Sequence, residues 1–244
     1  MTDTRFNLEK QLGSIRVDKD LLTRLEEYFL SELARMSGVS AKHFPKVFSI
    51  SITDGVGTEV LHSIKDHRPV QLPDSTQRVA VSYNTSFDYD DELAAKIDVN
   101  LSFGREDLYT ALKVNCSAPN ARQIAISIEE AVLLLLEPHW THNRLFHPFV
   151  GWEVLLFALM FVAAATGFTL IASGQISAAS WLLLLTAALL AYFYAAKRLK
   201  PWSSFDSRSD RANEEVWRWF KFGVLTFLLF GSLLTLLRKR LFGF

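Results

Sequence analysis

The sequence KIDVNLSF at residues 96–103 alternates between polar and apolar side chains. Its apolar members are Ile97, Val99, Leu101 and Phe103, and its polar members are Lys96, Asp98, Asn100 and Ser102. Because successive side chains of a β-strand point to opposite faces, the alternation predicts a strand with one buried and one solvated face. The turn-forming residues 104–107, GRED, lead into another strand at Leu108, so the pattern predicts a β-hairpin.

Further elements are predicted on both sides of this hairpin. The strands are expected at residues 46–53, 59–63, 78–84, 96–103 and 108–116, and amphipathic helices at residues 18–36 and 120–137. Asp18 is placed to cap the first helix, Gly38 to end it, and Pro138 to end the second. Strands in one run between two helices, without βαβ units, are typical of the α+β class. Residues 1–148 are therefore expected to form a cytosolic α+β domain with an antiparallel sheet of about five strands and flanking helices.

The remaining sequence is far more apolar. Residues 149–172 contain Glu153 as their only charge, residues 178–196 contain none, and residues 222–237 form a shorter uncharged run. At about 1.5 Å per residue the first two runs match the ~30 Å hydrocarbon core of a bilayer. The sequence thus predicts an α-helical transmembrane region: a helical hairpin over 149–196, a basic cytosolic loop over 197–221, and a third membrane segment with a basic tail over 222–244.

Two alternatives to this membrane interpretation remain open. The first two runs can instead form a buried helical hairpin of a soluble protein, although uncharged helices of this length are unusual there. The third run is short, and it can re-enter the bilayer or lie at its interface rather than span it.

Charge distribution supports an orientation. Lys and Arg number 26 and so do Asp and Glu, so the composition gives no indication of a nucleic-acid partner. Lys197, Arg198 and Lys200 follow the second run directly, whereas the linker at 173–177 is uncharged, and positive charge stays on the cytosolic side. We therefore expect a multi-pass membrane protein with a cytosolic N-terminal domain and the lipid bilayer as a partner. The cations at 238–240 would lie on the opposite side if the third run spans, which conflicts with the rule.

Candidate metal ligands occur in two groups, and neither has a diagnostic spacing. The first comprises Asp88, Asp90 and Asp91, and the second comprises His139, His142 and His147. A cation site needs fixed geometry and a supporting shell of hydrogen bonds. We interpret the first group as a solvated loop and the second as interfacial packing, and we expect no bound metal or cofactor. The lone Cys116 excludes an intrachain disulfide.

Small residues spaced four apart predict close packing between the apolar helices. They are Ala163 and Gly167 in the first run and Ala187, Ala191 and Ala195 in the second. Packing within the hairpin is one use of such a stripe, and assembly into a homo-oligomer is the other. Glu153 is expected to pair with Arg218 or Lys221, because an ionised carboxylate at this depth is costly without a cation or water.

Catalytic motifs are missing from the sequence. Gly55-Val56-Gly57 leads to a strand rather than a helix, and no Gly-x-Ser-x-Gly motif occurs. The favoured hypothesis is an integral membrane protein whose cytosolic domain binds an unknown small molecule or protein and relays its state to the membrane helices. The alternatives are an oligomeric effector that perturbs the bilayer and, with less support, an enzyme acting at the membrane surface.

Overall fold

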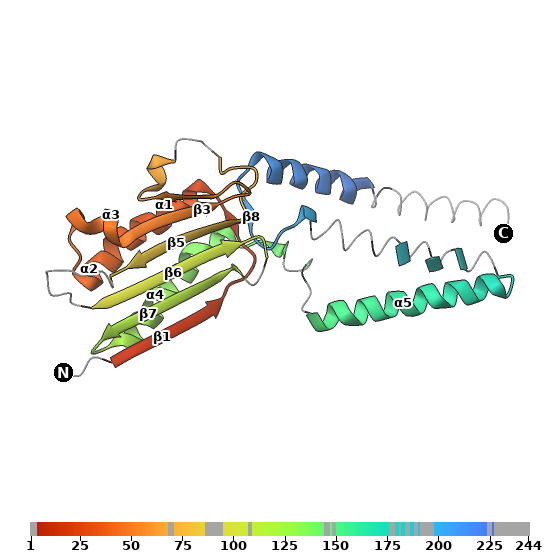
Figure 1. Cartoon of the computed structure of the whole chain (residues 1–244), viewed down its shortest axis with the longest axis horizontal. Helices are drawn as coiled ribbons and strands as arrows, with labels where there is room; N and C mark the ends of the chain where they lie inside the picture. The colour runs from red at the N-terminus through yellow and green to blue at the C-terminus, as the bar shows by residue number, and fades with distance from the viewer. Residues whose placement is uncertain are drawn as a thin grey trace.

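A six-stranded antiparallel sheet forms the N-terminal part of the protein (Figure 1). The computed structural model describes residues 4–67, 71–85, 95–106, 109–143, 147, 150–175, 179–180, 182–183, 186–187, 190, 198–223 and 226, with the side chains of 150–153 and 156 left aside. The strands are β1 (Thr4–Gln11), β3 (Phe48–Thr53), β4 (Thr58–Leu61), β5 (Arg78–Asn84), β6 (Lys96–Gly104) and β7 (Ala111–Ala118). Their order in the sheet is β1-β7-β6-β5-β3-β4.

Helices lie against one face of this sheet and extend from one end of it. They are α1 (Lys19–Tyr28), a π-turn (Phe29–Leu33), α2 (Ala34–Ser37), α3 (Phe44–Val47), α4 (Ala121–Leu136) and α5 (Val150–Ala172), and residues 208–223 are also helical. Single 3-10 turns occur at Ala41–His43, Ile64–Asp66 and Glu137–His139, and two short strands, β2 (Arg16–Val17) and β8 (Ser204–Phe205), form a separate pair. In Figure 1, α1 and α4 lie behind the sheet.

The alternation at residues 96–103 is confirmed by the structure. Ile97, Val99, Leu101 and Phe103 of β6 are all at most 2% exposed. The predicted hairpin also forms, since β6 and β7 pair antiparallel with Leu101 opposite Leu112. This residue pattern therefore produces an α+β domain in which the helices cover the apolar face of the sheet and the polar face stays open.

The helix predicted at residues 18–36 forms as three consecutive pieces. Asp18 caps α1 by accepting a hydrogen bond from the backbone N–H of Leu21 (2.9 Å), and Gly38 ends α2 in the left-handed conformation (φ 79°). At the π-turn between them, Phe29 is fully buried and meets the rings of Phe48 and Tyr83 edge-on, with centroids 6.1 and 6.4 Å apart. These contacts join the helix to β3 and β5.

The sheet contains one strand more than the sequence predicted. The additional strand, β1, pairs with β7 from Thr4 opposite Ala118 to Gln11 opposite Ala111. It lies at the edge of the sheet, and its only apolar residues are Phe6 and Leu8, both half-buried. An edge strand with so little apolar surface carries a weak alternation signal, which explains why the count of about five was wrong.

The prediction of a transmembrane region is also wrong for the residues that the structure describes. None of their helices combines the length and the apolar character that crossing a membrane requires. The second apolar run is described only in short pieces, and the third only to residue 223 and at 226.

A methyl group added at Gly104, the last residue of β6, tests the packing of the turn between β6 and β7. A Cβ placed on Gly104 would overlap the Cβ of Tyr109 and lie 3.3 Å from its Cα, so Gly104→Ala forces the backbone to shift. We expect the free energy of unfolding to fall by about 1–3 kcal/mol. Gly13→Ala is the control, because nothing lies within 4 Å of its new methyl group. Urea denaturation measures both changes, and equal stability of the two variants would contradict this packing.

Candidate functional site

After the apolar helices, the chain returns to the N-terminal domain and pairs with it. We call residues 200–211 the docking segment. Its strand β8 runs parallel to β2, with Ser204 N–H donating to the Ile15 carbonyl (3.0 Å) and Asp206 N–H to the Val17 carbonyl (2.9 Å). Phe205, 2% exposed, enters the same core cluster as the sheet residues. The docking segment thus adds both a strand and a core side chain to a domain built from residues far away in sequence.

The docking segment also binds the end of the β6–β7 hairpin. Trp202 N–H donates to the carbonyl of Arg105 (2.9 Å), and Ser203 N–H donates to that of Gly104 (3.2 Å). The buried hydroxyl groups of Ser203 and Thr110 are hydrogen-bonded at 3.1 Å. The end of β6 therefore receives the incoming segment through the carbonyls of Gly104 and Arg105.

Arg105 and Asp210 form a charged contact beneath Phe205. Arg105 Nη1 donates to Asp210 Oδ1 at 3.0 Å, and its Nε donates to the carbonyl of Thr76 at 2.7 Å. The other carboxylate oxygen of Asp210 accepts from the Phe205 backbone N–H at 2.8 Å, and the Arg105 guanidinium lies 5.6 Å from the centre of the Phe205 ring. Asp210 is only 5% exposed, so these partners replace most of the water around its carboxylate. Removing one partner of such a pair commonly costs about 3–5 kcal/mol.

A second carboxylate, Asp206, ties the docking segment to its own helix and to β2. Arg211 donates to both Asp206 oxygens, at 2.8 and 2.9 Å, and Arg16 approaches Asp206 Oδ1 at 3.4 Å. The hydrogen bond from Arg211 is the largest cause that holds the pKa of Asp206 below its usual value. A lowered folded-state pKa stabilises the docked form above the unfolded value of about 3.9, and this contribution is lost as the pH falls through the folded-state pKa.

The three predicted histidine candidates lie in different surroundings. His147 Nε2 is 2.7 Å from the carbonyl of Lys200, and its ring meets that of Trp202 edge-on at 5.8 Å, so it belongs to the docking contacts. His142 is exposed, and His139 Nδ1 lies 3.6 Å from Asp18 Oδ2. The acidic candidates Asp88, Asp90 and Asp91 lie outside the described residues.

His139 belongs to the group of possible cation ligands that the described residues contain. Its ring nitrogen and carboxylate oxygens of Asp18 and Asp20 lie within 4.8 Å of one another. Both carboxylates already have partners in the protein, because Asp18 caps α1 and Asp20 pairs with Arg24 at 3.0 Å. The arrangement therefore performs a structural role at the start of α1.

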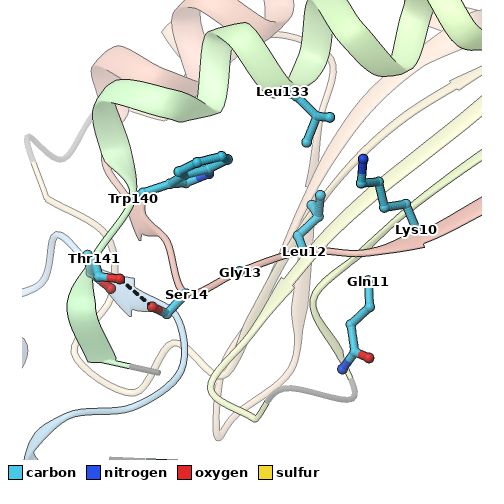
Figure 2. A pocket seen from close by; sticks show the side chains of 8 residues that line it. All are labelled: Lys10, Gln11, Leu12, Gly13, Ser14, Leu133, Trp140 and Thr141. Atoms are coloured by element: carbon cyan, nitrogen blue, oxygen red, sulfur yellow. Dashed lines mark hydrogen bonds between the residues drawn. The ribbon is translucent and has the colours of Figure 1, made fainter. Parts of the chain in front are cut away.

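A hollow of about 370 Å³ opens close to the docking segment, between the end of β1 and the end of α4 (Figure 2). It is lined by Lys10, Gln11, Leu12, Gly13, Ser14, Leu133, Trp140 and Thr141. Ser14 Oγ donates to the Thr141 carbonyl at 2.6 Å, and Thr141 N–H donates to the Ser14 carbonyl at 2.9 Å. The next residue, Ile15, forms a backbone bridge with Trp140 and accepts from Ser204. One short stretch of backbone therefore borders both the hollow and the docking segment.

The predicted helix-packing and ion-pair residues are described only in part. Gly167 of α5 is buried, and a Cβ placed there would lie 3.0 Å from the Leu183 side chain. Ala163 is half-buried and Ala187 exposed, whereas Ala191 and Ala195 lie outside the described residues. The pairing of Glu153 with Arg218 or Lys221 stays a prediction, since the Glu153 side chain also lies outside them.

Cys116 is not placed as a nucleophile. It is buried within β7, and this burial is the main cause that raises the pKa of its thiol, with a smaller contribution from the charge of Asp98. A thiol whose pKa is raised is largely protonated at neutral pH, and the protonated form is a poor nucleophile.

The docking residues Arg105, Phe205 and Asp210 were missed in the sequence. Their neighbourhood, WSSFDSRSD at 202–210, contained a usable signal: two aromatic residues in an otherwise polar stretch, and Ser207 three residues before Asp210. In the structure Asp210 N–H donates to Ser207 Oγ at 3.2 Å, as in a helix cap. The partners of these residues lie about a hundred positions earlier, which no local pattern reveals.

Comparison with known proteins gives no further guidance. No protein-family model, no curated protein and no solved structure matches this chain.

Proposed function

We propose that this protein couples a binding event in its N-terminal α+β domain to its C-terminal apolar helices. The observation that carries the proposal is the docking segment, in which Phe205 and Asp210 are held by Arg105 of the β6–β7 turn. The segment includes the first turn of the helix at 208–223 and lies after α5 in the chain, so any shift of its position also moves that helix. The domain thereby holds the helices through a specific, buried attachment.

The hollow in Figure 2 is the place where binding would affect this attachment. Its apolar wall, formed by Leu12, Leu133 and Trp140, fits an apolar or aromatic group of a small molecule or protein ligand. An occupant that moves Trp140 also moves Ile15, because the two are bridged, and Ile15 is the acceptor for Ser204. Binding and docking therefore share one backbone element and bias each other.

Docking is balanced rather than permanent in this proposal. Trp202 Nε1 and Ser204 Oγ are buried without a hydrogen-bond partner among the described residues. Each such group opposes docking by about 1–3 kcal/mol of lost hydration. This opposition partly offsets the charged contacts of Asp206 and Asp210. A ligand whose affinities for the docked and the undocked form differ only modestly can then shift the equilibrium between them.

In this proposal α5 and the helix at 208–223 supply the output by contacting lipid. In α5, Phe157, Phe161 and Phe168 are each more than half exposed, and their spacing places them on one face of the helix. In the helix at 208–223, Trp219 and Phe222 are exposed next to Arg218 and Lys221. An exposed aromatic face and aromatic residues beside cations both suit the headgroup region at the surface of a bilayer.

Neutralising the buried carboxylate should loosen the docking segment. Asp210→Asn keeps an oxygen for Phe205 N–H but removes the charge that compensates Arg105. We expect amide hydrogen exchange at residues 202–207 to accelerate by roughly ten- to a hundredfold, the equivalent of about 1.4–2.8 kcal/mol. Glu32→Gln is the matched control, because it removes the same charge from an exposed pair with Arg35 (2.6 Å) outside the docking segment. Equal exchange rates in the two variants would refute the role of Asp210.

Lipid contact is tested by flotation. The full chain, synthesised in a cell-free system with phosphatidylcholine–phosphatidylglycerol vesicles, should rise with the vesicles in a density gradient. Phe161→Asp with Phe168→Asp should reduce the floating fraction severalfold, because both changes place charge on exposed apolar surface of α5. Val60→Asp, on exposed β4, should leave it unchanged. A chain that stays at the bottom of the gradient would exclude lipid as the partner.

A further inference from the structure

Strand β1 presents an unusual edge. It is eight residues long and contains no proline, whereas β4 at the opposite edge has only four residues. In the described part of the chain β1 has a strand neighbour, β7, on one side only. Long edges of this kind are open to pairing with another strand, and proteins normally shorten, twist or cover them.

The register of β1 shows which backbone groups face outward. Leu12 N–H, just beyond the strand, donates to Thr110 on the β7 side. Because backbone groups alternate between the two edges of an antiparallel strand, the N–H and C=O groups of Arg5, Asn7 and Glu9 point away from β7. These three residues form the hydrogen-bonding set that a new strand would meet.

We propose that β1 pairs antiparallel with β1 of a second copy, around a two-fold axis at Asn7. In this register Arg5 lies opposite Glu9 of the partner subunit, and Asn7 lies opposite Asn7 of the partner subunit. On the other face Phe6 lies opposite Leu8 of the partner subunit. The two sheets then join into one continuous sheet.

The side chains of β1 specify this register and no adjacent one. Around Asn7 the segment RFNLE is self-complementary, with opposite charges on the open face and half-buried apolar residues on the helix face. A shift by two residues places Arg5 opposite Asn7 or Gln11 and loses both ion pairs. Glu9 also contacts Lys113 of its own chain at 2.8 Å, but it remains 65% exposed and has a second oxygen for the partner.

The neighbouring helix is compatible with this arrangement. α4 packs over both β1 and β7, and Ile126 on its β1 flank is 37% exposed and lines a hollow with Thr4. With strands about 4.8 Å apart, the α4 helices of two copies would lie at about 10 Å, an ordinary helix packing distance. The second copy would thus cover apolar surface as well as the strand edge.

Charge reversal tests the proposal in the full chain by sedimentation velocity. Arg5→Glu alone and Glu9→Arg alone each place like charges opposite one another twice, so each should weaken dimerisation by roughly tenfold or more. An equimolar mixture of these two variants should restore dimers, because every cross-subunit pair is then opposite in sign. Single variants that dimerise like the unchanged chain, or a mixture that stays monomeric, would overturn the proposal.

A crosslink tests the register separately. In a Cys116→Ser background, Asn7→Cys should form a disulfide-linked dimer on mild oxidation, because opposed residues of a hydrogen-bonded pair have Cα atoms about 5.5 Å apart. Arg5→Cys should not, since the two Arg5 positions would be about 13 Å apart along the strands. Equal crosslinking of both variants, or none with Asn7→Cys, would also overturn it.

Discussion

Among the described residues, the ion pair between Arg105 and Asp210 is the most buried charged contact between the N-terminal domain and the docking segment. Taking two charges out of water is costly, and the cost is met only when every remaining hydrogen-bonding group has a partner. Here the carboxylate binds the guanidinium with one oxygen and the Phe205 backbone with the other, while Arg105 also binds the Thr76 carbonyl. The pair therefore fixes the chain direction at β8, and Phe205 can enter the core only along that direction.

This attachment depends in turn on how the sheet is buried. The helices cover the apolar face of the sheet, and at the end of β6 the carbonyls of Gly104 and Arg105 receive the incoming segment. At the same end, the chain between β1 and α1 borders a hollow on one side and β8 on the other. In the proposed function the binding site and the attachment point share this backbone stretch, so their coupling requires no long pathway of side chains.

The α+β domain was largely predictable from local patterns. The alternation at 96–103 and the helical periodicity after Asp18 each reflect a face that is buried in the structure, and buried faces leave strong periodic signals. β1 was missed because an edge strand buries little. The transmembrane prediction was based on the length of uninterrupted runs of apolar residues, and the described helices do not support it. The contacts of the docking segment were not predicted, for another reason. Arg105 and Asp210 are 105 positions apart in the sequence, and a pair at that separation leaves no periodic pattern of apolar residues.

The central claim is that the hollow and the docking segment are coupled. It is tested most directly by changing the hollow and measuring amide exchange in the docking segment. Trp140→Ala removes a wall of the hollow without touching the docking segment, and Leu134→Ala removes an exposed side chain of α4 outside the hollow. Coupling predicts that amide exchange at Ser204 and Asp206 accelerates in Trp140→Ala and stays unchanged in Leu134→Ala. Unchanged exchange at both amides in Trp140→Ala would show that the two sites are independent and would contradict the account.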